Sequence, residues 1–205
     1  MTEHLVDASL TEWEDGIDLV LDTRVSLLPT EVWPHVTRSE LLEDWFVGYT
    51  TSDGPDDILL KLDDQPVPAQ VLSVSAPQAD DDEAHVLLDI DGIGRLGLTL
   101  RPLTGDDAEW TEHAATARTA DPTDSAGTAD VASARVVGTR VTLSHTIADR
   151  GIDHAVVAQV ITQVGPVWET HLRLLAGKLT QSPGAYDVPE SQLTLRYEQL
   201  AEEIG

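Results

Sequence analysis

One stretch of helical periodicity dominates the C-terminal part of this chain. From Asp153 to about Gln181, apolar residues recur every three or four positions, and this spacing places them on one face of an α-helix. The apolar residues of this face are Val157, Val160, Ile161, Val164, Trp168, Leu172, Leu175 and Leu179. Gly165 and Pro166 interrupt the pattern, so we expect the helix to bend there.

The segments before this helix alternate between apolar and polar residues, as half-buried strands do. Such alternation is found in residues 17–28, 58–62, 67–74, 86–90, 96–100 and 141–147. Turn signals separate several of these segments, namely the acidic run at 80–83 and the Asp91-Gly92 pair. Short strands separated by turns predict an antiparallel meander.

Helical spacing also occurs outside the long helix. Thr30 and Ser39 are favourable N-cap residues for two short helices between the first two strands. Residues 1–16 carry apolar residues at helical spacing, which predicts a short N-terminal helix or arm. The tail after residue 189 predicts a small amphipathic helix through Leu193, Tyr197, Leu200 and Ile204.

The chain of 205 residues is therefore predicted to form one α+β domain with extensions. We expect an N-terminal arm at 1–16, the domain at 17–182 and a C-terminal extension at 183–205. Residues 104–134 hold seven acids against Arg118 as their single base, with little apolar content beyond Trp110. This composition predicts a mobile acidic insertion between two neighbouring strands.

Composition argues against several function classes. The chain has 37 acidic and 12 basic side chains, a net charge of −25, and no cysteine. A disulfide scaffold, a cysteine nucleophile and a cysteine-bound metal are excluded. The cations are scattered along the sequence, so we expect no nucleic-acid partner. Two explanations of the charge stay open, an acidic, lysine-poor surface such as salt adaptation produces and an acidic partner-binding face.

The sequence also bears on location and on cofactors. No run approaches the ~18 apolar residues of a membrane span, and the N-terminus lacks the basic start of a signal peptide. We therefore expect a cytoplasmic protein with no membrane insertion. The acidic runs lack EF-hand spacing, no G-x-S-x-G elbow occurs, and the glycines at 92–97 are not followed by a helical pattern. We expect no metal and no cofactor.

Three segments resemble one known family. Residues 32–45, VWPHVTRSELLEDW, are similar to its helix-pair signature VW-x-x-x-T-x-x-x-x-L-x-x-W. Residues 164–179 resemble its final helix, and Gly138 with residues 139–145 is similar to its G-T-x-V-x-L-x-H strand. The family consists of homologues of the activator of the heat-shock chaperone ATPase. It belongs to the START (SRPBCC) superfamily, which includes polyketide cyclases and birch-pollen-allergen-like proteins.

The resemblance, over roughly residues 17–180, implies the helix-grip fold, in which a curved antiparallel sheet wraps the last helix around a cavity. The sequence departs from the family at Pro166-Val167, where the family has a tryptophan directly after its glycine. The candidate ligand-binding residues are Trp45, Tyr49, Leu98, Leu143, His145, Val164, Trp168, His171 and Leu172. The tryptophans either line this cavity or fill the core. His145 either polarises a ligand or is a satisfied core histidine.

Three functions follow from the resemblance and the residues. The first is a protein that binds a small hydrophobic or amphipathic ligand between the sheet and the last helix. The second is a cyclase- or hydrolase-type enzyme that uses the same cavity, with His145 as its candidate catalytic residue. The third is a protein-interaction module like the chaperone activators, with the tail helix as its surface. A homodimer is also left open.

Overall fold

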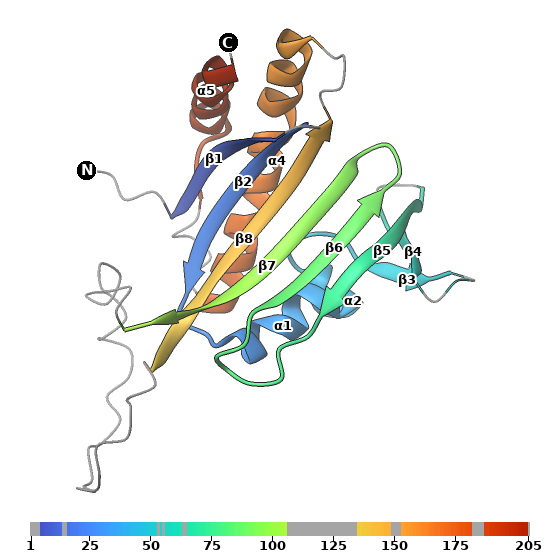
Figure 1. Ribbon diagram of the computed structural model, residues 1–205, viewed down its shortest axis with the longest axis vertical. Coiled ribbons are helices and arrows are strands. Elements are labelled where there is room, and N and C mark those ends of the chain that lie inside the picture. Colours follow the sequence, from blue (N-terminus) through green and yellow to red (C-terminus); the bar gives the residue numbers. More distant parts are fainter. Residues whose placement is uncertain are drawn as a thin grey trace, which may run out of the picture.

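The computed structural model describes residues 5–13, 16–52, 54, 56–62, 65–105, 135–148, 153–181 and 187–204. Eight antiparallel strands form one curved sheet with the order β1-β2-β8-β7-β6-β5-β4-β3 (Figure 1). The strands are β1 Val6–Trp13, β2 Gly16–Val25, β3 Tyr49–Thr51, β4 Asp57–Leu60, β5 Val67–Ser75, β6 Ala84–Ile90, β7 Gly94–Thr104 and β8 Val136–Ala148. The helices are α1 Pro29–Thr37, α2 Ser39–Leu42, α4 His154–Thr180 and α5 Glu190–Ala201, followed by a 3-10 turn at Glu202–Ile204.

The long helix α4 lies across one face of the sheet, as the apolar stripe predicts (Figure 1). Asp153 caps its N-terminus, and the carboxylate accepts a hydrogen bond from Ala155 N–H at 3.0 Å. The helix is continuous through Gly165 and Pro166, and Gln181, whose φ is 56°, is its C-cap residue. Its buried face meets the inward leucines of β2 and β8, and together they form the main apolar core.

The N-terminal segment forms a strand, and the expected helix is wrong. Residues 6–13 pair antiparallel with β2, Val6 opposite Thr23 and Leu10 opposite Leu19. Val6 and Leu10 are four residues apart, a spacing that satisfies both a helix face and one side of a strand. The free edge of β2 decides between them, because pairing there satisfies the backbone polar groups of both segments.

The expected caps of the two short helices are also wrong. α1 begins after Leu28, whose N–H donates to Glu31 Oε2 at 2.8 Å, and Thr30 lies inside the helix. Ser39 is the first residue of α2, and its hydroxyl donates to Tyr49 O and accepts from Tyr49 N–H, both at 2.7 Å. Ser39 therefore fixes the start of β3 instead of capping a helix.

The tail forms the expected amphipathic helix, α5, and this helix packs on its own domain. Leu193, Tyr197 and Ala201 are buried against α4. A Cβ at Gly165 would lie 2.2 Å from Cδ1 of Tyr197, so the glycine makes room for the tyrosine ring.

The inserted segment lies largely outside the described residues, which break off between 105 and 135. Its flanking strands β7 and β8 are direct neighbours in the sheet, as expected. In the part of the chain that the structure describes, no helix is long and apolar enough to cross a membrane.

Candidate functional site

A small apolar cavity lies between the sheet and the helices, with a volume of about 50 Å³. The sheet contributes side chains from β6, β7 and β8, and the helical side contributes α1, α2, the turn after α2, and α4. The lining residues are Val36, Leu42, Trp45, Phe46, Val86, Leu88, Leu96, Leu98, Leu143 and Trp168. This is the space between sheet and last helix that the resemblance implies.

A cross-strand row of apolar residues runs from the surface to the cavity. Val74, Val86, Leu98 and Leu143 are direct partners on β5, β6, β7 and β8, so their side chains share one face. Val74 is 60% exposed, Val86 and Leu98 are half-buried, and Leu143 is 1% exposed. Exposure is highest at Val74 on β5 and lowest at Leu143 on β8, so the row leads from the exposed β5 side of the sheet to the buried interior.

Aromatic rings form the helical wall of the cavity. Phe46 is central, with its ring centroid 5.9 Å from Trp45, 5.7 Å from Trp168 and 5.3 Å from His171. The residues around Phe46, numbers 43–48, form a turn between α2 and β3, which we call the gate segment.

Three contacts that involve side chains attach the gate segment to α1 and α4. Trp45 Nε1 donates to His35 O at 2.8 Å, and His171 Nδ1–H donates to Trp45 O at 2.7 Å. Lys178 on α4 forms an ion pair with Asp44 at 2.8 Å. The ion pair is largely exposed, so it contributes little to stability.

The described residues that line the cavity offer no free hydrogen-bonding side chain. Among them, the polar side-chain groups are the two indole N–H groups, and both are engaged, Trp45 with His35 O and Trp168 with His145 Nδ1 at 3.1 Å. Such a lining favours contact with apolar groups.

His145 is held in one neutral form beside this cavity. Because its Nδ1 accepts from Trp168, its Nε2 carries the proton and donates to Ile93 O at 2.9 Å. The side chain is 3% exposed, and burial lowers the pKa of His145 below its ordinary 6.5, although the Ile93 hydrogen bond and the charge of Asp18 oppose this shift. Both nitrogens are partnered within the protein, which matches the core-histidine interpretation.

The structure distributes the nine candidate residues over the site and its surroundings. Trp45, Leu98, Leu143 and Trp168 line the cavity. His145 and His171 both contact Trp168 but do not line the cavity themselves. His145 accepts the hydrogen bond from the Trp168 indole, and the ring centroid of His171 lies 6.0 Å from that of Trp168.

The remaining three candidates do not line the cavity. Tyr49 is engaged elsewhere, because its hydroxyl donates to Thr37 O at 2.7 Å. Val164 is half-buried against the core, and Leu172 is fully buried in it.

Sequence reasoning missed six lining residues and one polar cluster. Three of the six missed lining residues, Val86, Leu88 and Leu96, alternate on strands already identified, and that pattern was the available signal. The polar cluster centres on Glu169, which is 0% exposed on α4.

Glu169 binds three side chains at once. Arg173 Nη2 donates to Oε1 at 2.6 Å, Arg196 Nη1 donates to Oε2 at 2.8 Å, and the Tyr197 hydroxyl donates to Oε2 at 2.8 Å. Arg196 also donates to Val6 O at 2.9 Å. The cluster therefore ties α5 to both α4 and β1.

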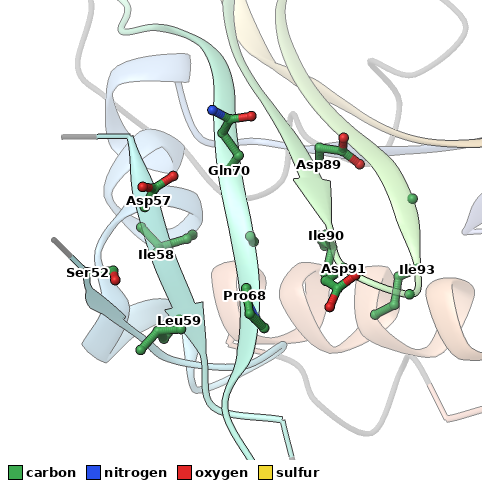
Figure 2. A pocket seen from close by; sticks show the side chains of 13 residues that line it. Ser52, Asp57, Ile58, Leu59, Pro68, Gln70, Asp89, Ile90, Asp91 and Ile93 are labelled. Atoms are coloured by element: carbon green, nitrogen blue, oxygen red, sulfur yellow. The ribbon is translucent and has the colours of Figure 1, made fainter. Parts of the chain in front are cut away.

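A second hollow, of about 860 Å³, is wide open and lies along β4, β5, β6 and the β6–β7 turn (Figure 2). Asp57, Gln70 and Asp89 are direct cross-strand partners in its lining, and Asp91 lies beside the β6–β7 turn. These aspartates make no ion pair with any described residue, and no described group of three or more His, Asp or Glu could hold a metal ion. We favour the inner cavity, because it is apolar and partly enclosed.

Comparison with solved structures identifies the architecture. The crystal and solution structures of CalU16 from Micromonospora echinospora match with a TM-score of 0.57 each, at 14% and 13% identity. The crystal structure covers 98% of both chains, and the solution structure covers 100% of both. The chain has the helix-grip fold.

A second match has the same architecture. The conserved protein of unknown function EF2215 from Enterococcus faecalis has a TM-score of 0.55 and 13% identity, and the alignment covers 97% of this chain and 92% of that one. No family model matches the sequence, and no curated protein matches it. These structural matches establish the helix-grip fold and the expected α+β class. Because the sequence identities are only 13–14%, the matches say nothing about the ligand.

Proposed function

We propose that this helix-grip protein binds a small hydrophobic or amphipathic molecule between its sheet and α4. The observation that carries the proposal is the cavity beside Trp168, whose ten lining residues are all apolar or aromatic and whose two indole N–H groups are both engaged. Protein interiors are normally close-packed, so an apolar molecule that fills this cavity would add packing contacts. The row from Val74 to Leu143 gives the cavity an apolar approach from the surface.

Ligand binding requires the gate segment to move. The cavity volume of about 50 Å³ is smaller than the ~150 Å³ that a benzene-sized guest occupies. Phe46 is half-buried and stands between the cavity and Trp45 and His171. A rotation of the Phe46 ring, with a displacement of the gate segment that keeps the hydrogen bond from Lys61 N–H to Gly48 O, enlarges the cavity.

The enzyme alternative has no reactive side chain among the described residues that line the cavity. Acid–base catalysis needs a titratable side chain within hydrogen-bond reach of the ligand, and none of the ten lining residues is titratable near neutral pH. His145 uses both ring nitrogens within the protein. The protein-interaction alternative needs apolar residues of the tail helix to be exposed. Leu193 and Tyr197 of this helix are instead buried against the rest of the chain.

The first test is denaturing extraction of freshly purified protein, followed by mass spectrometry of the extract. A stoichiometric apolar compound is expected. A direct binding test then uses naphthalene as the probe, added to the protein while Trp fluorescence and methyl resonances are recorded. Saturable shifts of the Leu98 and Leu143 methyl groups are expected.

A matched pair of variants locates the site. Val86→Trp places an indole inside the cavity, whereas Leu87→Trp places the same group on the opposite face of the same strand. Naphthalene binding is expected to be lost in Val86→Trp and kept in Leu87→Trp. Equal binding by both variants, with both folded by circular dichroism, overturns the proposed site.

A further inference from the structure

Three arginines form a row on the outer face of the sheet, opposite α4. Arg24 on β2 is the direct partner of Arg140 on β8, and Arg140 is the direct partner of Arg101 on β7. Their sequence positions alternate with the inward residues Val25, Val141 and Leu100, so all three project from the face turned toward the viewer in Figure 1. Three of the twelve basic residues that are scattered along the sequence thus lie side by side in the fold.

This arrangement is electrostatically unfavourable for the protein by itself. Like charges directly opposite on neighbouring strands destabilise a sheet. The chain has ten arginines and 37 acidic residues. The acidic residues outnumber the arginines, so each arginine could have an acidic partner on a neighbouring strand. A bound anion would reduce the repulsion between these three neighbouring arginines.

The row is only partly neutralised by the described residues. Arg101 Nε donates to Glu83 Oε2 at 2.9 Å, and both side chains are at least half exposed. Asp22 lies two residues from Arg24 on the same face and accepts a hydrogen bond from Thr142. Arg24 and Arg140 form no ion pair and no side-chain hydrogen bond with any residue that the structure describes.

We propose that the Arg24–Arg140–Arg101 row is a binding site for a multiply charged oxyanion, such as the linked phosphoryl groups of a di- or triphosphate. Neighbouring strands are about 4.8 Å apart, so the row spans roughly 10 Å and presents three guanidinium groups in line. Guanidinium groups bind phosphoryl oxygens with paired hydrogen bonds. A single-charged anion engages one arginine, whereas a linked polyanion engages the whole row.

This site is separate from the proposed apolar cavity, because the row and the cavity lie on opposite faces of the sheet. Its binding test uses inorganic tripolyphosphate, measured by calorimetry and by the side-chain Nε–Hε resonances of arginine. The measurement is made at an ionic strength of about 0.1 M, where exposed charges beyond about 10 Å are screened. We expect saturable binding with shifts at Arg24, Arg101 and Arg140, and much weaker binding of chloride and acetate.

Two variants make the test specific. Arg140→Gln removes the central charge and is expected to weaken tripolyphosphate binding about tenfold or more. Arg95→Gln removes an arginine from the same face of β7, six residues from Arg101 and outside the row, and is expected to leave the affinity unchanged. Because Arg140→Gln relieves like-charge repulsion, its melting temperature without ligand is expected to match or exceed that of the unmodified protein.

Three outcomes overturn the proposal. They are the absence of saturable tripolyphosphate binding, an equal loss of affinity in Arg95→Gln and Arg140→Gln, and a lower melting temperature of Arg140→Gln without ligand. The last result would show that the row serves the stability of the fold.

Discussion

Trp168 donates its indole N–H to Nδ1 of His145, so the helix and the sheet are joined by a buried hydrogen bond at the edge of the cavity. The two rings are nearly perpendicular, with an interplanar angle of 75° and a centroid separation of 5.7 Å. Through this bond, α4 sets the tautomer of the histidine on β8. Its ring then donates to the β6–β7 turn at Ile93.

Replacing Trp168 by Phe removes the donor and leaves Nδ1 of His145 buried without a partner. An unsatisfied buried acceptor costs about 1–3 kcal/mol, so we expect the free energy of unfolding to fall by that amount in urea denaturation. Trp33→Phe is the matched control, because the Trp33 indole makes no hydrogen bond to a described residue. An equal loss in both variants would assign the effect to ring volume.

The buried neutral His145 makes stability depend on pH. Its pKa in the folded protein is below 6.5 because of burial, and the unfolded chain restores the ordinary value. Below pH 6.5 the unfolded state therefore binds a proton that the folded state does not. Stability falls as the pH falls through this window, by at most about 1.4 kcal/mol per pH unit for this one histidine.

The measurement is the difference in unfolding free energy between the unmodified protein and His145→Gln, from pH 7.5 to 5.5. This comparison cancels the carboxylates that both proteins share. The difference is expected to shrink as the pH falls below 6.5. His35, whose pKa is lowered by burial and by the charge of Lys178, adds the same sign of slope to both proteins. A pH-independent difference would contradict the neutral buried histidine.

Replacing Glu169 by Gln should strongly destabilise the protein. The change removes the charge that two arginines and Tyr197 share, and breaking a buried ion pair costs about 3–5 kcal/mol. Hydrogen exchange should accelerate in α5 more than in β7 and β8, because the cluster attaches α5 to α4 and β1. The control is Glu198→Gln on the exposed face of α5. Unchanged exchange in α5 would show that apolar packing alone holds it.

Gly165→Ala distinguishes helix propensity from packing. Alanine is favoured over glycine in a helix by about 1 kcal/mol, so propensity alone predicts a more stable protein. The added Cβ, however, would lie 2.2 Å from Tyr197 Cδ1, and such overpacking costs roughly 1–3 kcal/mol. We expect a net loss of stability in thermal unfolding. In a Tyr197→Ala background the same substitution should be neutral or stabilising, and a persistent loss there would rule out this clash.

Much of the framework is visible in the sequence because it is local. Alternation within each strand and the 3.6-residue period of α4 arise from backbone geometry, so they predicted the central strands, the last helix and several cavity residues. Leu98, Leu143 and Trp168 were identifiable because each lies on the apolar side of its own element.

Local patterns in the chain therefore predict which side of each strand and helix faces the core. Which elements pair with one another depends on the packing of the whole fold. β1 is a strand because β2 offers it a free edge, Gly165 is required because Tyr197 packs on it, and His145 is neutral because Trp168 reaches it from α4. The arginine row likewise exists only through the register of β2, β8 and β7. Each of these relationships joins residues far apart in the chain, and local periodicity carries no information about register or about the neighbour across a packed interface.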